Sequence, residues 1–238
     1  MKHLDILQEA LLACAAKESD VELLARRCIA GDADIFLKDI MFDNLCLNIP
    51  ADPNSGIIRM DHVFSGNGHR LTLDILKWKD EHRQEPDFIL EFVHNSTFES
   101  PTYAPNNTRK KMIKSAGYAE LHHPGGQIDM YVIALVTHIY RLDPFYRYKF
   151  RGAFYNGIVD ARDKRKECIS SITEEFTSHS SEYEVYSDGV LLRHDGYLGF
   201  GVELNYFICD GTFEQRSNKL RFGETYPEVN SSKKKKKK

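Results

Sequence analysis

The segment PDFILEFV, residues Pro86–Val93, carries the most information about the fold. After Pro86 and Asp87 it is almost continuously apolar, and Glu91 is the one charged residue inside the run. A short apolar run of this kind is typical of a β-strand that other elements cover on both faces. We therefore expect a central strand here, with one carboxylate placed inside it.

A second strand is predicted just before it, in the sequence HRLTLDILKW of His69–Trp78. Its apolar residues recur at every second position, which is the period of a strand, and Asp74 lies in the middle of the pattern. The polar segment Lys79–Glu85 separates the two strands and is suited to a hairpin loop. The two carboxylates are therefore expected on neighbouring strands.

The rest of the chain alternates between helical and strand patterns. Amphipathic periodicity predicts helices over residues 3–17, 19–31, 108–116 and 162–176, whereas 35–48 fits either a helix or a strand. Further strands are predicted at 57–64, 130–139 and 145–151, and in a C-terminal β-meander around 183–187, 190–193 and 198–208, with hairpin turns at Asp188–Gly189 and Asp195–Gly196. This order predicts an α/β (α+β) fold with a mixed β-sheet flanked by helices.

Length and composition agree with such a fold. The chain has 238 residues, of which 42% are hydrophobic and 28% charged, and this excludes disordered, collagen-like and coiled-coil classes. We expect an N-terminal helical segment over residues 1–50, one α/β domain over 51–230, and a disordered oligolysine tail over 231–238. The run Lys233–Lys238 is interpreted as an appended tag. Without its six lysines, 26 basic residues face 35 acidic ones, so the body carries a net charge of −9.

The five cysteines are scattered, and no two stand at CxxC spacing. This argues against a disulfide framework or a zinc knuckle and favours a reducing compartment, cytoplasmic or nuclear. The uncharged run Met130–Ile139 is too short to cross a bilayer, and residues Met1–Asp5 lack the features of a signal peptide. We expect no membrane association.

Asp74 and Glu91 are the first candidates for chemistry. An ionised carboxylate inside an apolar strand is costly unless it is paired or binds a cation. If the two side chains meet, their oxygens form a site suited to Mg²⁺ or Mn²⁺. The plainer interpretation is that both face solvent from a half-exposed sheet.

The predicted helix Thr108–Ala116 supplies a cation. Steps of 100° per residue place Arg109 on the same face as three apolar residues, Met112, Ile113 and Ala116. The lysines of this helix, Lys110, Lys111 and Lys114, are expected to point sideways or outward. Two strand carboxylates and one inward cation are the groups that metal-dependent phosphodiester hydrolysis uses. The alternative is an arginine that extends to the solvent from the start of the helix.

These segments resemble a known family. Asp74 within Leu73–Ile75, the run Pro86–Phe92, and Arg109–Glu120 are similar to the Uma-type restriction-endonuclease-like family of the PD-(D/E)XK nuclease superfamily. Members carry an upstream strand aspartate, a strand that begins with proline and aspartate and ends in glutamate, and a lysine on the following helix. Counting back from the end of Arg109–Glu120 puts Arg109 at the position of that lysine. The resemblance covers about residues 69–140.

The resemblance implies a restriction-endonuclease-like core and hydrolysis of phosphodiester bonds in DNA or RNA with Mg²⁺ or Mn²⁺ as cofactor. Asp74, Glu91 and the carbonyl group of Phe92 would hold the metal. Arg109 or Lys110 would stabilise the developing negative charge. Nucleic acid is the expected partner, and a homodimer is a further expectation.

A basic and aromatic strand, Phe145–Arg151, is a candidate for contacts with nucleic acid. Arg147, Lys149 and Arg151 fall on one side of it and, together with Lys111, could bind phosphates. An amphipathic edge strand would show the same alternation.

Two other functions remain open. The order of features is also similar to the cap-snatching endonuclease domains of viral RNA polymerases, in which an early helix supplies a ligand, and Glu9 or Glu22 could take that role. A rival from another class is a noncatalytic binding or interaction module that keeps the nuclease fold without its chemistry.

Overall fold

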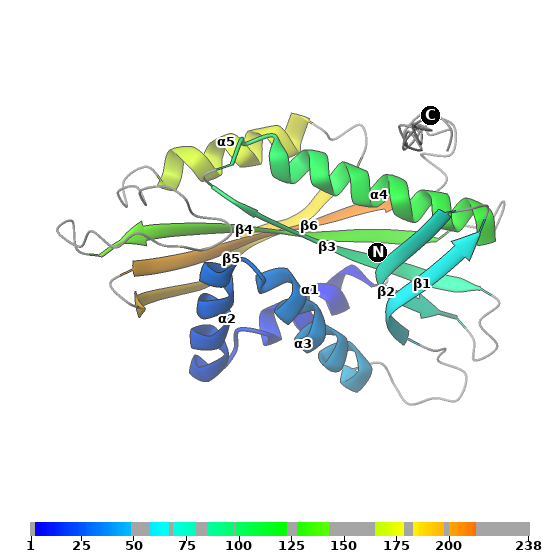
Figure 1. Ribbon diagram of the computed structural model, residues 1–238, viewed down its shortest axis with the longest axis horizontal. Helices are drawn as coiled ribbons and strands as arrows, with labels where there is room; N and C mark the ends of the chain where they lie inside the picture. Colours follow the sequence, from blue (N-terminus) through cyan, green and yellow to red (C-terminus); the bar gives the residue numbers. More distant parts are fainter. Residues whose placement is uncertain are drawn as a thin grey trace, which may run out of the picture.

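The computed structural model of the chain describes residues 3–48, 58–66, 69–79, 85–97, 99–122, 128–142, 165–178, 183–197 and 200–212. These residues form five helices and six strands (Figure 1). The helices are α1 (Leu4–Ala13), α2 (Glu18–Ala30), α3 (Ala33–Asn48), α4 (Tyr103–His122) and α5 (Arg165–Ser178). The strands are β1 (Ile58–Gly66), β2 (His69–Trp78), β3 (Pro86–Ser96), β4 (Asp129–Arg141), β5 (Glu184–Tyr197) and β6 (Phe200–Thr212).

The six strands form one mixed sheet in the order β1-β2-β3-β4-β6-β5. β3 and β4 are parallel, and every other neighbouring pair is antiparallel. A parallel pair needs a crossover connection, and α4 provides it because it lies between β3 and β4 in the chain. The expectation of a mixed sheet flanked by helices is confirmed.

Helices cover both faces of this sheet, so the fold has three layers (Figure 1). The first three helices share one buried cluster with one face of the sheet, and α4 and α5 share a second cluster with the other face. β3 contributes to both clusters, with Phe88 and Leu90 on the α1–α3 side and Ile89 and Val93 on the α4 side. The helical segment expected over residues 1–50 therefore shares a core with the sheet.

The stretch that the sequence left open between helix and strand forms α3. Its fully buried residues recur at every fourth position, which is helical spacing, and they are Ala33, Leu37, Met41 and Leu45. The preceding helix ends at Gly31, as predicted. Gly31 has a φ of 83°, a left-handed conformation that glycine adopts without steric cost.

Two boundaries differ from the sequence-based expectation. The helix predicted from Thr108 begins at Tyr103, with Pro105 in its first turn, where the missing N–H group of proline removes no helical hydrogen bond. The hairpin turn predicted at Asp188–Gly189 is wrong, because β5 runs through it and stays paired with β6 by shifting register at three places. The turn predicted at Asp195–Gly196 also lies within β5 and is wrong. In the described residues, β5 and β6 form one long antiparallel pair in place of a meander of three strands. The predicted strand Phe145–Arg151 and the oligolysine tail lie outside the described residues.

None of the described helices is both long enough and apolar enough to span a membrane.

Gly201 in β6 is expected to be the least tolerant glycine among those described. An added Cβ atom would overlap the ring carbons Cε2 and Cζ of Tyr140 and lie 2.7 Å from Oδ1 of Asp195. The ring is 3% exposed, and its hydroxyl group donates a hydrogen bond to Asp195, so it has little room to move. We expect Gly201→Ala to lower the free energy of unfolding by about 3 kcal/mol, as measured by urea denaturation.

The double variant Gly201→Ala with Tyr140→Ala provides the control. If overlap with the Tyr140 ring is the cause, Gly201→Ala lowers the free energy of unfolding much less in the Tyr140→Ala background than in the wild type. The same cost in both backgrounds would show that the account of Gly201 is wrong.

Candidate active site

The candidate site lies where β2 separates from β3. The two strands pair from Trp78–Pro86 to Ile75–Leu90, and beyond that point β3 continues to Ser96 with β4 as its partner among the described strands. Asp74 is the residue before Ile75 on β2, so it lies just beyond the last β2–β3 pair. Its Oδ2 atom accepts a hydrogen bond of 2.8 Å from the N–H group of Phe92. A side-chain carboxylate therefore replaces the next backbone partner of β3.

Glu91 lies next to this point and is fully buried. It shares the strand face of Ile89 and Val93, which is the face that α4 covers. One step beyond the last β2–β3 pair, the same register brings Asp74, whose side chain is 17% exposed, beside Glu91. The interpretation in which both carboxylates face solvent is therefore wrong.

Two lysines of α4 bind these carboxylates. Nζ of Lys111 lies 2.9 Å from Oδ2 of Asp74 and 2.7 Å from Oε2 of Glu91. Nζ of Lys114 lies 2.6 Å from Oε1 of Glu91 and donates a hydrogen bond of 2.6 Å to the backbone oxygen of Thr72. Residues three apart in a helix share one side of it, so both ammonium groups reach the same point.

The expected inward cation, Arg109, is therefore corrected to Lys111. The buried face of α4 includes two polar residues, Thr108 and Ser115, whereas Ile113 is only partly buried. The prediction placed Ile113 on the apolar face that packs on the sheet. The predicted helix was therefore rotated about its axis relative to the structure, and Arg109 was expected to point inward in place of Lys111. Arg109 is partly buried, and Lys110 is exposed beside Asn107, with neither within ion-pair distance of Asp74 or Glu91 in the described structure.

Burial and charge set the proton affinities of this cluster. Burial raises the pKa of Glu91 to about 7, and the negative charge of Asp74 adds to this, while the two lysines oppose it. Burial alone would also raise the pKa of Asp74, but its hydrogen bonds and the charge of Lys111 lower it. Of the two carboxyl groups, Asp74 thus ionises first and Glu91 titrates near neutral pH.

This difference predicts how stability depends on pH. The pKa of Glu91 is higher in the folded protein than its ordinary value of 4.5. Glu91 therefore contributes fully to the free energy of unfolding below pH 4.5, and this contribution is lost as the pH rises through about 7. One pKa unit corresponds to about 1.4 kcal/mol, so the loss is roughly 3 kcal/mol. Asp74 affects the free energy of unfolding only at lower pH. Because its pKa is lowered in the folded protein, its stabilising contribution is lost only as the pH falls below 3.8.

The measurement compares wild-type protein with Glu91→Gln in urea unfolding between pH 4.5 and 8. We expect the wild type to lose stability relative to the variant as the pH rises, because the variant lacks the titrating group. Parallel curves for the two proteins would contradict the assignment of this titration to Glu91.

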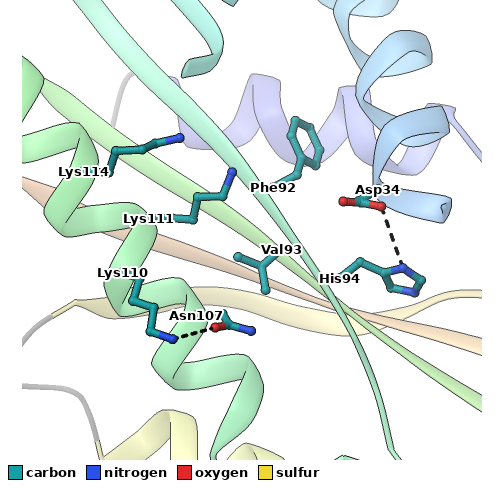
Figure 2. Close-up of a pocket in the computed structure, with 8 residues that line it drawn as sticks. All are labelled: Asp34, Phe92, Val93, His94, Asn107, Lys110, Lys111 and Lys114. Carbon is teal, nitrogen blue, oxygen red and sulfur yellow. Dashed lines mark hydrogen bonds and ion pairs between the residues drawn. The ribbon is translucent and has the colours of Figure 1, made fainter. Parts of the chain in front are cut away.

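A pocket of about 430 Å³ opens beside the cluster. Figure 2 shows lysines from α4 on one side of it and Asp34, from the first turn of α3, on the other, with β3 passing between them. The residues that line it are Asp34, Phe92, Val93, His94, Asn107, Lys110, Lys111 and Lys114. The pocket thus spans the open edge of β3 from one helical layer to the other.

The oxygen atoms at this edge are of the chemical type that binds Mg²⁺, and in this structure Nζ of Lys111 lies between the two carboxylates. In a strand the N–H and C=O groups of one residue point to the same side, so the carbonyl oxygen of Phe92 faces Asp74 as its N–H group does. Two carboxylates and a carbonyl are the hard oxygen ligands that Mg²⁺ and Mn²⁺ prefer. The described residues contain no cluster of three or more His, Cys, Asp or Glu side chains arranged for a metal. A metal here would therefore depend on Asp74, Glu91 and backbone oxygen.

The other predicted site residues are distributed as follows. Arg147, Lys149 and Arg151 lie outside the described residues. Glu9 and Glu22 are exposed and do not line the pocket, and Glu22 pairs with Arg26.

Two charged pocket residues were not assigned to the site from the sequence: Lys114, which was expected to point sideways or outward, and Asp34. Spacing could have indicated Lys114, because it lies one turn after Lys111 on the same side of the helix. Asp34 and His94 could not have been brought together, because their contact depends on how α3 packs against β3.

Comparison of the chain with protein-family models, with curated proteins and with solved structures gave no match.

Proposed function

We propose that this protein is a metal-dependent nuclease with a restriction-endonuclease-like core. One observation carries the proposal: Asp74 and Glu91, from adjacent strands, converge on Nζ of Lys111 at 2.9 and 2.7 Å beside an open pocket. A fully buried carboxylate held among charged groups is costly to maintain, and such clusters in pockets are typical of functional sites.

Lys111 strengthens the resemblance to the PD-(D/E)XK superfamily. The family pattern noted above requires an aspartate, a glutamate and a lysine on the following helix, and here a lysine contacts both acids. The resemblance seen in the sequence placed Arg109 in that role. The contacts of Lys111 thus support the family's chemistry better than the sequence did.

In the proposed reaction Asp74, Glu91 and the Phe92 carbonyl would hold Mg²⁺ or Mn²⁺. When bound, the ion supplies polarisation of the phosphate and activation of water. Lys111 stabilises the negative charge that develops on the phosphate, and a protonated ammonium group at a preorganised position is suited to this. Lys114 holds Glu91 from its other oxygen and is anchored by Thr72, so it positions the carboxylate.

The test is cleavage of supercoiled plasmid and of single-stranded RNA in Mn²⁺, Mg²⁺ or EDTA. We expect cleavage of at least one substrate with a metal and none in EDTA. Asp74→Ala and Glu91→Ala proteins, purified in parallel, control for contaminating nucleases. Equal activity in all three proteins, or no cleavage under any condition, would remove the proposal.

A second candidate is a binding module without catalysis. It is favoured by the balance of charge, since two lysines already compensate the two carboxylates. In that case the wild-type protein binds nucleic acid but neither binds Mn²⁺ nor cleaves.

A further inference from the structure

The pocket has two chemically different ends. At one end α4 presents Lys110, Lys111 and Lys114, and at the other α3 presents Asp34 beside His94 (Figure 2). The three ammonium groups outnumber the two carboxylates behind them, so this end attracts anions. A phosphate group is the natural ligand there under the proposed function.

The opposite end is suited to a hydrogen-bond donor. The side chain of Asp34 is 34% exposed, and its Oδ1 atom lies 3.9 Å from Nδ1 of His94. The His94 ring is fixed from the other side by a 2.7 Å hydrogen bond between Nε2 and the hydroxyl group of Thr137. An ionised carboxylate only accepts hydrogen bonds, so Asp34 selects a ligand with an N–H or O–H group at that end.

The size of the pocket limits what can enter. A volume of about 430 Å³ is in the range of sites for small molecules and suits one nucleotide. The lysines and Asp34 lie on opposite sides of the sheet, so a ligand that contacts both ends must pass around the open edge of β3. A base within a duplex cannot do so unless it leaves the stack, which costs a few kcal/mol and least for a base that is already unpaired.

From these features we infer that the pocket binds one unpaired nucleotide, with its phosphate at the α4 lysines and its base or sugar donating a hydrogen bond to Asp34. The substrate is then a single-stranded nucleic acid. This inference rests on the proposed function for the phosphate end and adds the substrate class and the role of Asp34.

The test is binding without catalysis. Fluorescence anisotropy in EDTA compares a short labelled single-stranded DNA, the RNA of the same sequence, and the corresponding DNA duplex. We expect the single strands to bind about tenfold more tightly than the duplex, because they avoid the unstacking cost.

Asp34→Asn is the more specific test, because the direction in which it changes affinity distinguishes two roles of Asp34: repulsion of phosphate and acceptance of a hydrogen bond. If Asp34 only repels phosphate, removing its charge strengthens binding; if it accepts a hydrogen bond from the nucleotide, binding of the single strands weakens about tenfold. A larger loss for RNA than for DNA identifies the 2′-hydroxyl as the donor, and an equal loss identifies the base. Asp39→Asn, an exposed position on the same helix, measures the effect of charge alone.

Lys110→Gln should weaken binding of both single strands, because this exposed lysine lines the anion end. Circular dichroism and thermal unfolding verify that each variant is folded. Duplex binding as tight as single-strand binding, or an Asp34→Asn protein that binds as well as or better than wild type, would overturn the inference. Metal-dependent cleavage could persist in that case, whereas single-strand binding with no cleavage would remove the nuclease proposal alone.

Discussion

Glu91→Gln is expected to reduce metal-dependent cleavage on the order of a thousandfold, and Asp74→Asn to have an effect of similar size. Both substitutions keep the shape of the side chain and remove one of the two anionic ligands proposed for the metal. The stabilisation that a bound cation provides is several kcal/mol, which corresponds to a loss of this size. The measurement is the initial rate of plasmid or RNA cleavage in saturating Mn²⁺.

Glu203→Gln is the matched control for these variants. Glu203 is also a buried glutamate on a strand, 1% exposed, and it pairs with Arg193 at 2.7 Å. It lies on β6, does not line the pocket, and is not proposed to act in the reaction. A similar loss of activity in Glu203→Gln and Glu91→Gln would mean that any buried ion pair in the sheet is needed for folding, and the assignment of Glu91 to catalysis would fail.

Lys111→Met is expected to give the second largest effect, a loss of cleavage of about a hundredfold to a thousandfold. The methionine keeps most of the volume of the lysine stem and removes the one ammonium group that contacts both carboxylates in the described structure. Loss of one preorganised charge that stabilises a transition state is typically of this magnitude. The readout is kcat for cleavage, with Mn²⁺ affinity measured on the same protein.

Two comparisons separate catalysis from folding. Lys77→Met removes a lysine that is more deeply buried than Lys111 and pairs with Asp87 at the far end of the β2–β3 pair, so it should lower stability but not the rate of the folded protein. Lys114→Met should reduce activity less than Lys111→Met, because Lys114 contacts Glu91 but not Asp74. If Lys111→Met and Lys77→Met have the same kcat, Lys111 has no part in the reaction.

The two acidic residues of the site could be predicted from the sequence, because a carboxylate inside an apolar strand is visible as a break in a periodic pattern. Asp74 and Glu91 are such breaks, and an antiparallel pair of neighbouring strands brings them together. The fold class followed from the same patterns.

The cationic part of the site could not be predicted correctly. The orientation of α4 depends on Thr108 and Ser115, which are polar but buried where the helix packs on the sheet. The periodicity of apolar residues fixes the rotation of such a helix about its axis only to within about one residue. An error of that size was enough to place Arg109 on the inward side in place of Lys111. Asp34 was beyond the reach of pattern analysis, since its position depends on the packing of a separate helical layer.

Under the proposed function, Asp74 and Glu91 together bind a divalent cation. It is tested most directly by calorimetric titration of Mn²⁺ into wild-type protein and into Glu91→Gln, with Glu203→Gln as control. We expect a saturable heat of binding in the wild type and in the control, and its loss in Glu91→Gln. No binding in the wild type, or the same binding in all three proteins, would contradict it.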